Sequence, residues 1–255
     1  MAENFNGKEM KKHIPNLITG LNAASGMMAV FMALYSEMVW AAGLIVAGMV
    51  FDFFDGMAAR LLHVKSEMGK ELDSLADVIS FGVAPALLAH LLIRDLLFPE
   101  GAGDIALLTI ADWGILFIPL LIPVFSAFRL AKFNLDVRQA TSFIGLPTPA
   151  NALFWVTLVF GAVYIPELYE RWFANIYVLG LSVLILSVLL VSELPMFSLK
   201  IAGWGWKENR TRFLYFICLI VLAILMKVAV IVLIIPLYVF FAAGEALMRF
   251  TSLNR

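Results

Sequence analysis

The sequence predicts an all-α integral membrane protein with about eight transmembrane helices, and three observations support this fold class. Hydrophobic residues make up 62% of the 255-residue chain, charged residues only 15%, and the mean hydropathy is +0.94. Soluble domains usually carry more charge and fewer apolar residues. The chain also contains a series of apolar runs of membrane-spanning length, and its basic residues gather in alternate loops between these runs.

The apolar runs can be placed in order along the chain. A bilayer core of about 30 Å needs about 20 helical residues to cross it. The runs that meet this requirement lie near 17–36, 39–61, 73–97, 113–133, 148–166, 173–192, 211–227 and 229–249. Only Lys227 and later Pro236 interrupt the last two runs, so one kinked helix is an alternative there. Two spans joined by a tight turn are favoured.

The distribution of basic residues predicts the topology, because Lys and Arg collect in cytoplasmic loops. With eight spans and a cytoplasmic N-terminus, all but Arg94, Arg171 and Lys227 of the 18 basic residues fall on the cytoplasmic side. The cytoplasmic set is Lys8, Lys11, Lys12, Arg60, Lys65, Lys70, Arg129, Lys132, Arg138, Lys200, Lys207, Arg210, Arg212, Arg249 and Arg255. We therefore expect a multi-pass protein of the inner or plasma membrane with both termini in the cytoplasm.

The chain is expected to form one transmembrane catalytic domain over residues 13–255, preceded by a polar cytoplasmic tail over 1–12. The tail is expected to be frayed or to lie on the membrane surface. No loop is long enough for a separate domain. The first apolar run lacks a small-residue cleavage pattern, so it is expected to remain as a helix. The net charge of −1 and the absence of a separate basic stripe give no indication of nucleic-acid binding.

Four aspartates, two at the end of the second apolar run and two at the start of the third, are the strongest candidates for chemistry. Asp52 and Asp55 share one helical face, as do Asp73 and Asp77. If the two faces meet, four carboxylates lie together and repel one another unless cations neutralise them. The pattern predicts a divalent metal site at the cytoplasmic surface of the membrane.

The residues around the aspartates suit a phosphorylated substrate. Gly56, Ala59 and Gly69 are small enough for a substrate to approach the backbone. Arg60, Lys65 and Lys70 add positive charge nearby, and Ser66 offers a hydroxyl group. Oxygen ligands favour Mg²⁺ or Mn²⁺ over zinc, and His13, His63 and His90 show no ligand spacing. Two such ions sharing the aspartates could support phosphoryl-group transfer.

The complete pattern D-x2-D-G-x2-A-R-x8-G-x3-D-x3-D from Asp52 to Asp77 resembles the signature of the CDP-alcohol phosphotransferases. The resemblance implies a six-helix core, here with two additional helices, and transfer of a phosphatidyl group from a CDP-linked lipid to an alcohol with release of CMP. It also implies that Asp52 and Asp73 bind both metals and that Asp55 binds one. Asp77 then binds the second metal and acts as general base. A homodimer is expected from the resemblance alone.

The same resemblance implies the residues that bind the CDP-lipid. Gly56, Arg60 and Ser66 resemble positions that contact it, and Ala59 and Gly69 make room for it. For each aspartate taken alone, a helix cap or a solvated helix end is the alternative interpretation. The full set of fixed positions makes that alternative weak.

Segments outside the signature resemble the branch of the family that uses L-serine as acceptor. They are 14–19 with Asn22 and 25–26, 69–77, 128–134, 143–150 and, more loosely, 192–198. The expected reaction transfers the phosphatidyl group of CDP-diacylglycerol to L-serine, at a site among membrane lipids. Arg129 and Lys132 could bind the serine carboxylate, and Asn134 and Asn22 are further candidates for the serine-binding pocket. Both basic residues could instead simply flank a span.

Two further functions remain as alternatives. The acceptor could be glycerol 3-phosphate or an inositol phosphate, although a phosphorylated acceptor favours a denser basic pocket. A cation- or proton-coupled transporter would also carry membrane carboxylates, but spread through the membrane depth rather than gathered at one face.

Overall fold

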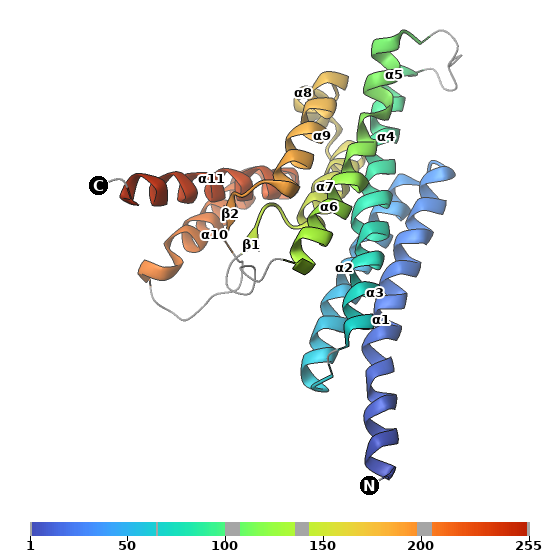
Figure 1. Ribbon diagram of the computed structural model, residues 1–255. Helices are drawn as coiled ribbons and strands as arrows, with labels where there is room; N and C mark the ends of the chain where they lie inside the picture. The colour runs from blue at the N-terminus through green and yellow to red at the C-terminus, as the bar shows by residue number, and fades with distance from the viewer. Residues whose placement is uncertain (1, 65, 100–107, 136–142, 198–205, 254–255) are drawn as a thin grey trace.

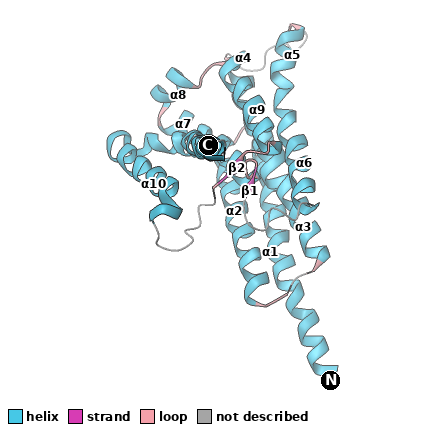
Figure 2. Ribbon diagram, turned by 60° about the vertical axis from the view of Figure 1, so that its left-hand side comes forward, coloured by secondary structure: helices cyan, strands magenta, loops and turns pink. Residues whose placement is uncertain are grey.

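The computed structural model describes the chain except for residues 1, 65, 100–107, 136–142, 198–205 and 254–255. Of the basic residues used to predict topology, Lys65, Arg138, Lys200 and Arg255 lie outside this description, as do the side chains of Lys8, Lys11, Lys12, Lys207 and Arg249. The described part of the chain is almost entirely helical, as the composition predicts (Figures 1 and 2).

The first two helices form an antiparallel pair with an extensive shared contact. They are α1 (Ala2–Leu34) and α2 (Met38–Leu61). The polar residues before His13 continue α1, so the predicted frayed tail is helical. Pro15 lies inside this helix and has no N–H to donate. The hydroxyl of Thr19 donates a hydrogen bond of 3.0 Å to the carbonyl of Pro15, one turn earlier, so the polar side chain is satisfied within the helix.

The next two predicted spans are each built from several helical segments. The first consists of α3 (Glu67–Asp77), the π-helix η1 (Val78–Val83) and α4 (Ala84–Leu97). The second consists of α5 (Ile110–Phe117), the 3₁₀ turn η3 (Ile118–Leu120) and α6 (Leu121–Leu135). Phe81, Leu88 and Ile122 from these spans are fully buried and form part of the core with Ile45 and Trp155.

The following segments are shorter and include a small β-ladder. They are β1 (Phe143–Ile144), α7 (Thr148–Tyr164), α8 (Pro166–Trp172), α9 (Ile176–Val191) and β2 (Pro195–Met196). The two strands pair antiparallel, with Phe143 opposite Met196. Between α8 and α9 the chain bends by 80°.

The last apolar stretch is a helical hairpin, as the favoured interpretation predicts. It contains α10 (Trp206–Met226), the 3₁₀ segment η5 (Lys227–Leu233) and α11 (Ile234–Leu253). The rings of Tyr215 and Phe241 lie 6.0 Å apart, whereas a straight helix would separate these positions by about 39 Å. Lys227 has φ +53° at the start of the turn. In Figure 1, α11 runs across the long axis of α1.

The predicted number of eight spans needs qualification. Within the described residues, five helices are long and apolar enough to cross a membrane, or six if the bent pair α8 and α9 forms one span. All eight predicted runs are helical, but α7 has only 17 residues, and the hairpin from Asn209 to Met248 counts as a single apolar run.

Candidate active site

The four aspartates of the signature lie in the second halves of α2 and α3. Asp52 and Asp55 occupy the last turns of α2, and Asp73 and Asp77 the last turns of α3. The start of α3 is fixed by Ser66, whose Oγ accepts a hydrogen bond of 3.0 Å from the backbone N–H of Gly69. The cap sets the direction of α3 and so brings its carboxylates to α2.

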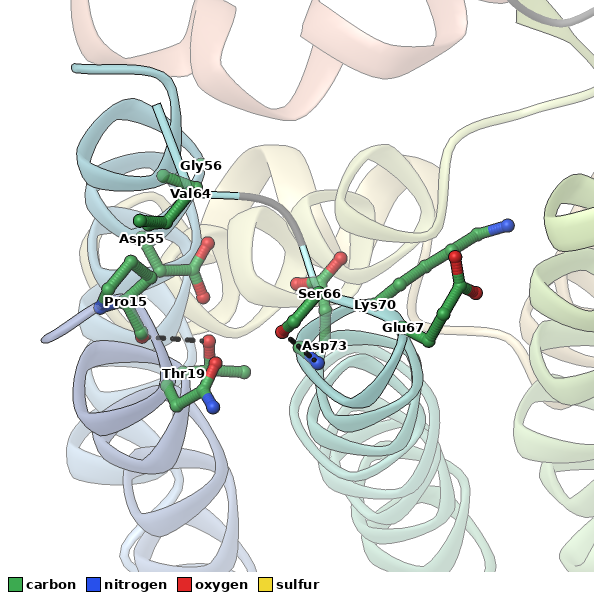
Figure 3. A pocket seen from close by; sticks show the side chains of 12 residues that line it. Pro15, Thr19, Asp55, Gly56, Val64, Ser66, Glu67, Lys70 and Asp73 are labelled. Atoms are coloured by element: carbon green, nitrogen blue, oxygen red, sulfur yellow. Dashed lines mark hydrogen bonds between the residues drawn. The ribbon is translucent and has the colours of Figure 1, made fainter. Parts of the chain in front are cut away.

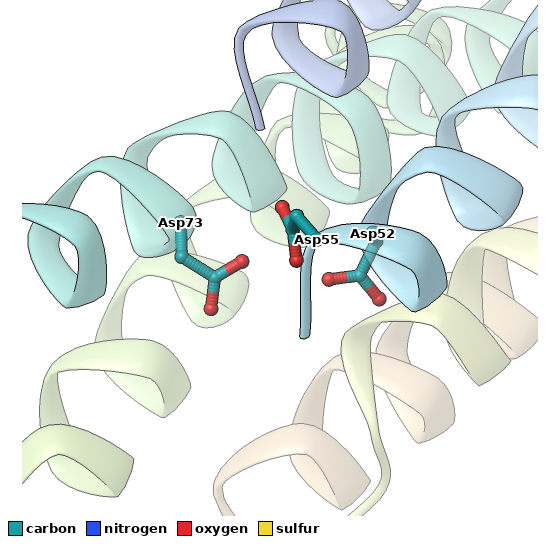
Figure 4. Close-up of side chains that lie close together, drawn as sticks. All are labelled: Asp52, Asp55 and Asp73. Carbon is teal, nitrogen blue, oxygen red and sulfur yellow. The ribbon is translucent and has the colours of Figure 1, made fainter. Parts of the chain in front are cut away.

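Three of these carboxylates form a compact cluster. Asp52, Asp55 and Asp73 each offer an oxygen, and these oxygens all lie within 4.8 Å of one another. Figure 4 shows Asp52 and Asp73 pointing toward each other from α2 and α3, with Asp55 between them. Two unit charges at this separation repel by about 3 kcal/mol at an effective dielectric constant of about 20. The arrangement therefore suits a bound cation.

Unpaired oxygen atoms provide an independent indication of a cation site. Oδ2 of Asp55 and Oδ1 of Asp73 are buried and have no hydrogen-bond partner. Buried polar atoms are nearly always satisfied, so such atoms point to a missing water or ion. No histidine belongs to the cluster. The ring of His63 contacts the carbonyl of Leu61, and the ring of His90 contacts that of Leu116.

Asp77 lies beside this cluster in a more enclosed position. Only 8% of its surface is exposed, and its Oδ1 accepts a hydrogen bond of 3.3 Å from Nδ2 of Asn22. Its charge interacts unfavourably with those of Asp52 and Asp73 and favourably with that of Arg129. Asp77 is thus within electrostatic reach of both the acidic cluster and a buried cation.

A cavity of about 470 Å³ opens next to the acidic cluster. Figure 3 shows residues of α1 on one side of it and residues at the start of α3 on the other. Its lining is Pro15, Asn16, Thr19, Asp55, Gly56, Ala59, Val64, Ser66, Glu67, Gly69, Lys70 and Asp73. A volume of this size falls in the range of small-molecule sites.

The predicted lipid-binding residues meet at this cavity with one exception. Gly56, Ala59, Ser66 and Gly69 line it. Arg60 is exposed and is not part of the lining; its Nε donates to the carbonyl of Gly56 at 2.8 Å. Arg60 is thus hydrogen-bonded to a residue of the cavity wall without lining the cavity itself.

The predicted acceptor-binding residues lie in different environments. Arg129 is buried, donates from Nη1 to Oγ1 of Thr148 at 3.3 Å, and has an unpaired Nε atom. Lys132 instead forms an ion pair of 2.6 Å with Glu193. Asn134 donates to Oγ of Ser74 at 2.9 Å. Only Arg129 keeps a buried, unpaired donor for a ligand.

Several residues at the site are not singled out by the sequence pattern. Thr19, Val64 and Glu67 line the cavity; Thr19 lies in the segment 14–19 and the other two at variable positions of the signature, so the pattern does not mark them as cavity residues. Asn151, one turn after Thr148 on α7, is fully buried with both amide atoms unpaired. An isolated asparagine in an apolar run carries no spacing signal, so sequence reasoning misses it.

Comparison with known proteins relates most of the chain, including the acidic cluster, to one family. Residues 12–180 match the sequence profile of the family described as CDP-alcohol phosphatidyltransferase. A Bacillus subtilis protein named CDP-diacylglycerol–serine O-phosphatidyltransferase is 40% identical over 148 residues, which cover 58% of this chain and 76% of the relative. A Helicobacter pylori protein of the same name is 37% identical over 196 residues, covering 76% of this chain and 75% of the relative. A Methanocaldococcus jannaschii protein of that name is 34% identical over 143 residues, covering 56% and 58%.

Proposed function

Because the chain belongs to the CDP-alcohol phosphatidyltransferase family, we propose that it transfers the phosphatidyl group of CDP-diacylglycerol to L-serine, giving phosphatidylserine and CMP. The observation that carries the proposal is the acidic cluster of Asp52, Asp55 and Asp73 beside a cavity of suitable size. The names of the relatives support L-serine as the acceptor. In this proposal the site lies at the cytoplasmic face of the cell membrane, and both termini lie on the same side. The protein acts as a homodimer.

The acidic cluster fits a divalent metal centre, since it combines hard oxygen donors with unpaired buried carboxylate oxygens. Asp52, Asp55, Asp73 and Asp77 would hold Mg²⁺ or Mn²⁺, with two ions in the complete site. When bound, the metal neutralises the negative charge of the pyrophosphate and of the departing phosphate. This donor set contains no Cys or His, which zinc would favour.

The cavity suits the nucleotide part of the lipid substrate. Gly56, Ala59 and Gly69 leave space at its wall, and Ser66 and Arg60 lie within or beside it as hydrogen-bond donors. Because the surrounding helices expose apolar side chains, the acyl chains would extend among the membrane lipids while the cytidine group enters the cavity.

Asp77 is the residue best placed to act as base. Serine enters beside Asp77 and Arg129, with its carboxylate on the guanidinium group. Asp77 takes the proton from the serine hydroxyl, and the hydroxyl oxygen attacks the phosphorus on the lipid side of the pyrophosphate. The bond to the CMP phosphate breaks, and CMP leaves with the electron pair. Burial of Asp77 and Arg129 keeps water away from both groups.

Replacement of Arg129 by leucine is expected to raise the KM for L-serine by about 10- to 100-fold, because a charged hydrogen bond to the carboxylate is lost. The KM for CDP-diacylglycerol should stay the same. Steady-state CMP release with each substrate varied in turn measures both values. Arg94→Leu is the matched control, since Arg94 pairs with its neighbour Asp95 on the exposed surface. A variant with an unchanged KM for L-serine would exclude Arg129 from the acceptor site.

The first test of the function is CMP release by the purified protein with CDP-diacylglycerol and Mn²⁺ or Mg²⁺. L-serine, glycerol 3-phosphate and inositol phosphate are compared as acceptors. Release that requires L-serine is the expected result. Release only with a phosphorylated acceptor would support the family chemistry but exclude L-serine as the acceptor. No release with any acceptor would favour the alternative function as a transporter.

A further inference from the structure

We propose that Asn22 is a positioning residue for Asp77, and that a close crossing of α1 and η1 holds the two side chains together. The proposal rests on the proposed role of Asp77 as the base. Asn22 is fully buried, and its Nδ2 bonds to Oδ1 of Asp77 at 3.3 Å although 55 residues separate them. A carboxylate only accepts hydrogen bonds, so the amide nitrogen is the atom that must face it. One carboxylate oxygen is thereby fixed, and the other is left for the serine proton.

A second contact ties Asn22 to the segment that follows Asp77. Oγ of Ser80 donates to the backbone carbonyl of Asn22 at 2.9 Å, and Ser80 is fully buried in η1. A single residue of α1 therefore holds both the Asp77 side chain and the backbone three residues later. Both contacts must break before the segment from Asp77 to Ser80 can move away from α1.

The crossing depends on two glycines next to these contacts. A Cβ atom added to Gly26 would lie 2.6 Å from Cα of Ser80, a backbone atom that cannot move aside. A Cβ atom on Gly48 of α2 would lie 3.0 Å from Oδ1 of Asn22. The missing side chains thus allow α1, α2 and η1 to approach around Asn22. Within the described residues, Oδ1 of Asn22 has no hydrogen-bond partner. The bond from Nδ2 to Asp77 is therefore the one side-chain hydrogen bond that Asn22 makes there.

The test is a double-mutant cycle between Asn22→Leu and Asp77→Asn, with kcat and both KM values measured from radiolabelled CDP-diacylglycerol. In the wild-type background, Asn22→Leu is expected to lower kcat by about 10- to 100-fold with little change in either KM, as for a lost hydrogen bond to a charged group. In the Asp77→Asn background the same change should cost less than about threefold, because Asn22 acts through Asp77.

Two outcomes would overturn the proposal. Equal losses in both backgrounds would indicate a purely structural role, and a raised KM for L-serine with unchanged kcat would indicate a direct substrate contact. Full activity of Asp77→Asn alone would instead reject the proposed base, and this arm of the cycle is read independently of Asn22.

If Asn22→Leu does not fold, a second pair of variants tests the positioning role of Asn22. Gly26→Ala should separate α1 from η1 and lower kcat at least tenfold without changing the KM for CDP-diacylglycerol. Gly20→Ala is the matched control on the same helix, because an added Cβ there meets no atom within 4 Å. Wild-type kcat in Gly26→Ala would overturn the proposed positioning role.

Discussion

Replacement of Asp77 by asparagine is expected to lower kcat for CMP release by about 10²- to 10⁴-fold, the range for removal of a general base. Asparagine has nearly the same shape but cannot accept the serine proton. It can still face Asn22 and Arg129, so the fold should remain intact. The measurement is CMP release at saturating CDP-diacylglycerol and L-serine.

The control for this variant must separate chemistry from folding. Asp77→Asn should elute from size-exclusion chromatography in detergent at the wild-type position, and it should keep the wild-type KM for CDP-diacylglycerol. A folded variant that still releases CMP at the wild-type rate would show that another group takes the proton.

Replacement of Asp73 by asparagine is expected to abolish activity and to change stability in opposite directions with and without metal. In EDTA, loss of one charge relieves repulsion within the cluster of Asp52, Asp55 and Asp73, so the variant should unfold at a higher temperature than wild type. A relief of about 1 kcal/mol corresponds to about 2–4 °C for a chain of this size. Added Mn²⁺ should raise the Tm of the wild type strongly and that of the variant little.

Glu71→Gln is the matched control for this measurement. Glu71 is exposed on the same helix and is not a member of the acidic cluster. Its replacement removes the same charge but should leave the Tm in EDTA and the response to Mn²⁺ unchanged. If Asp73→Asn lowers the Tm in EDTA, its carboxylate supports the fold in some way other than by binding metal.

Those parts of the molecule that depend on local pattern could be predicted from sequence. Apolar runs of spanning length became helices because a buried backbone must satisfy its own hydrogen bonds. The cluster of Asp52, Asp55 and Asp73 followed from helical spacing, since residues three or four apart share a face. Most of the cavity wall followed for the same reason, because Gly56, Ala59 and Gly69 flank those positions.

The remaining features depend on contacts between distant segments. Nothing in the spacing indicates that Lys132 pairs with Glu193, because the partners lie 61 residues apart and meet only through the packing of α6 and α9. The contact of Asn22 with Asp77 has the same origin. The bend between α8 and α9 could not be predicted either, because composition alone does not distinguish one broken span from one straight span.

The π-helix η1 makes this region sensitive to chain length. The helix α3 before it carries Asp73 and Asp77, whereas α4 after it buries Ala84 and Leu88 in the core. A regular α-helix with the same number of residues over Val78–Val83 would rotate α4 by about 100° relative to α3, because the wide turn accommodates about one residue more than an α-helical turn. Either the carboxylates or the apolar face would then leave its place. The extra residue of η1 therefore sets the rotation of α4 relative to α3, and a deletion within η1 preserves this rotation only if the wide turn closes to an α-helical turn.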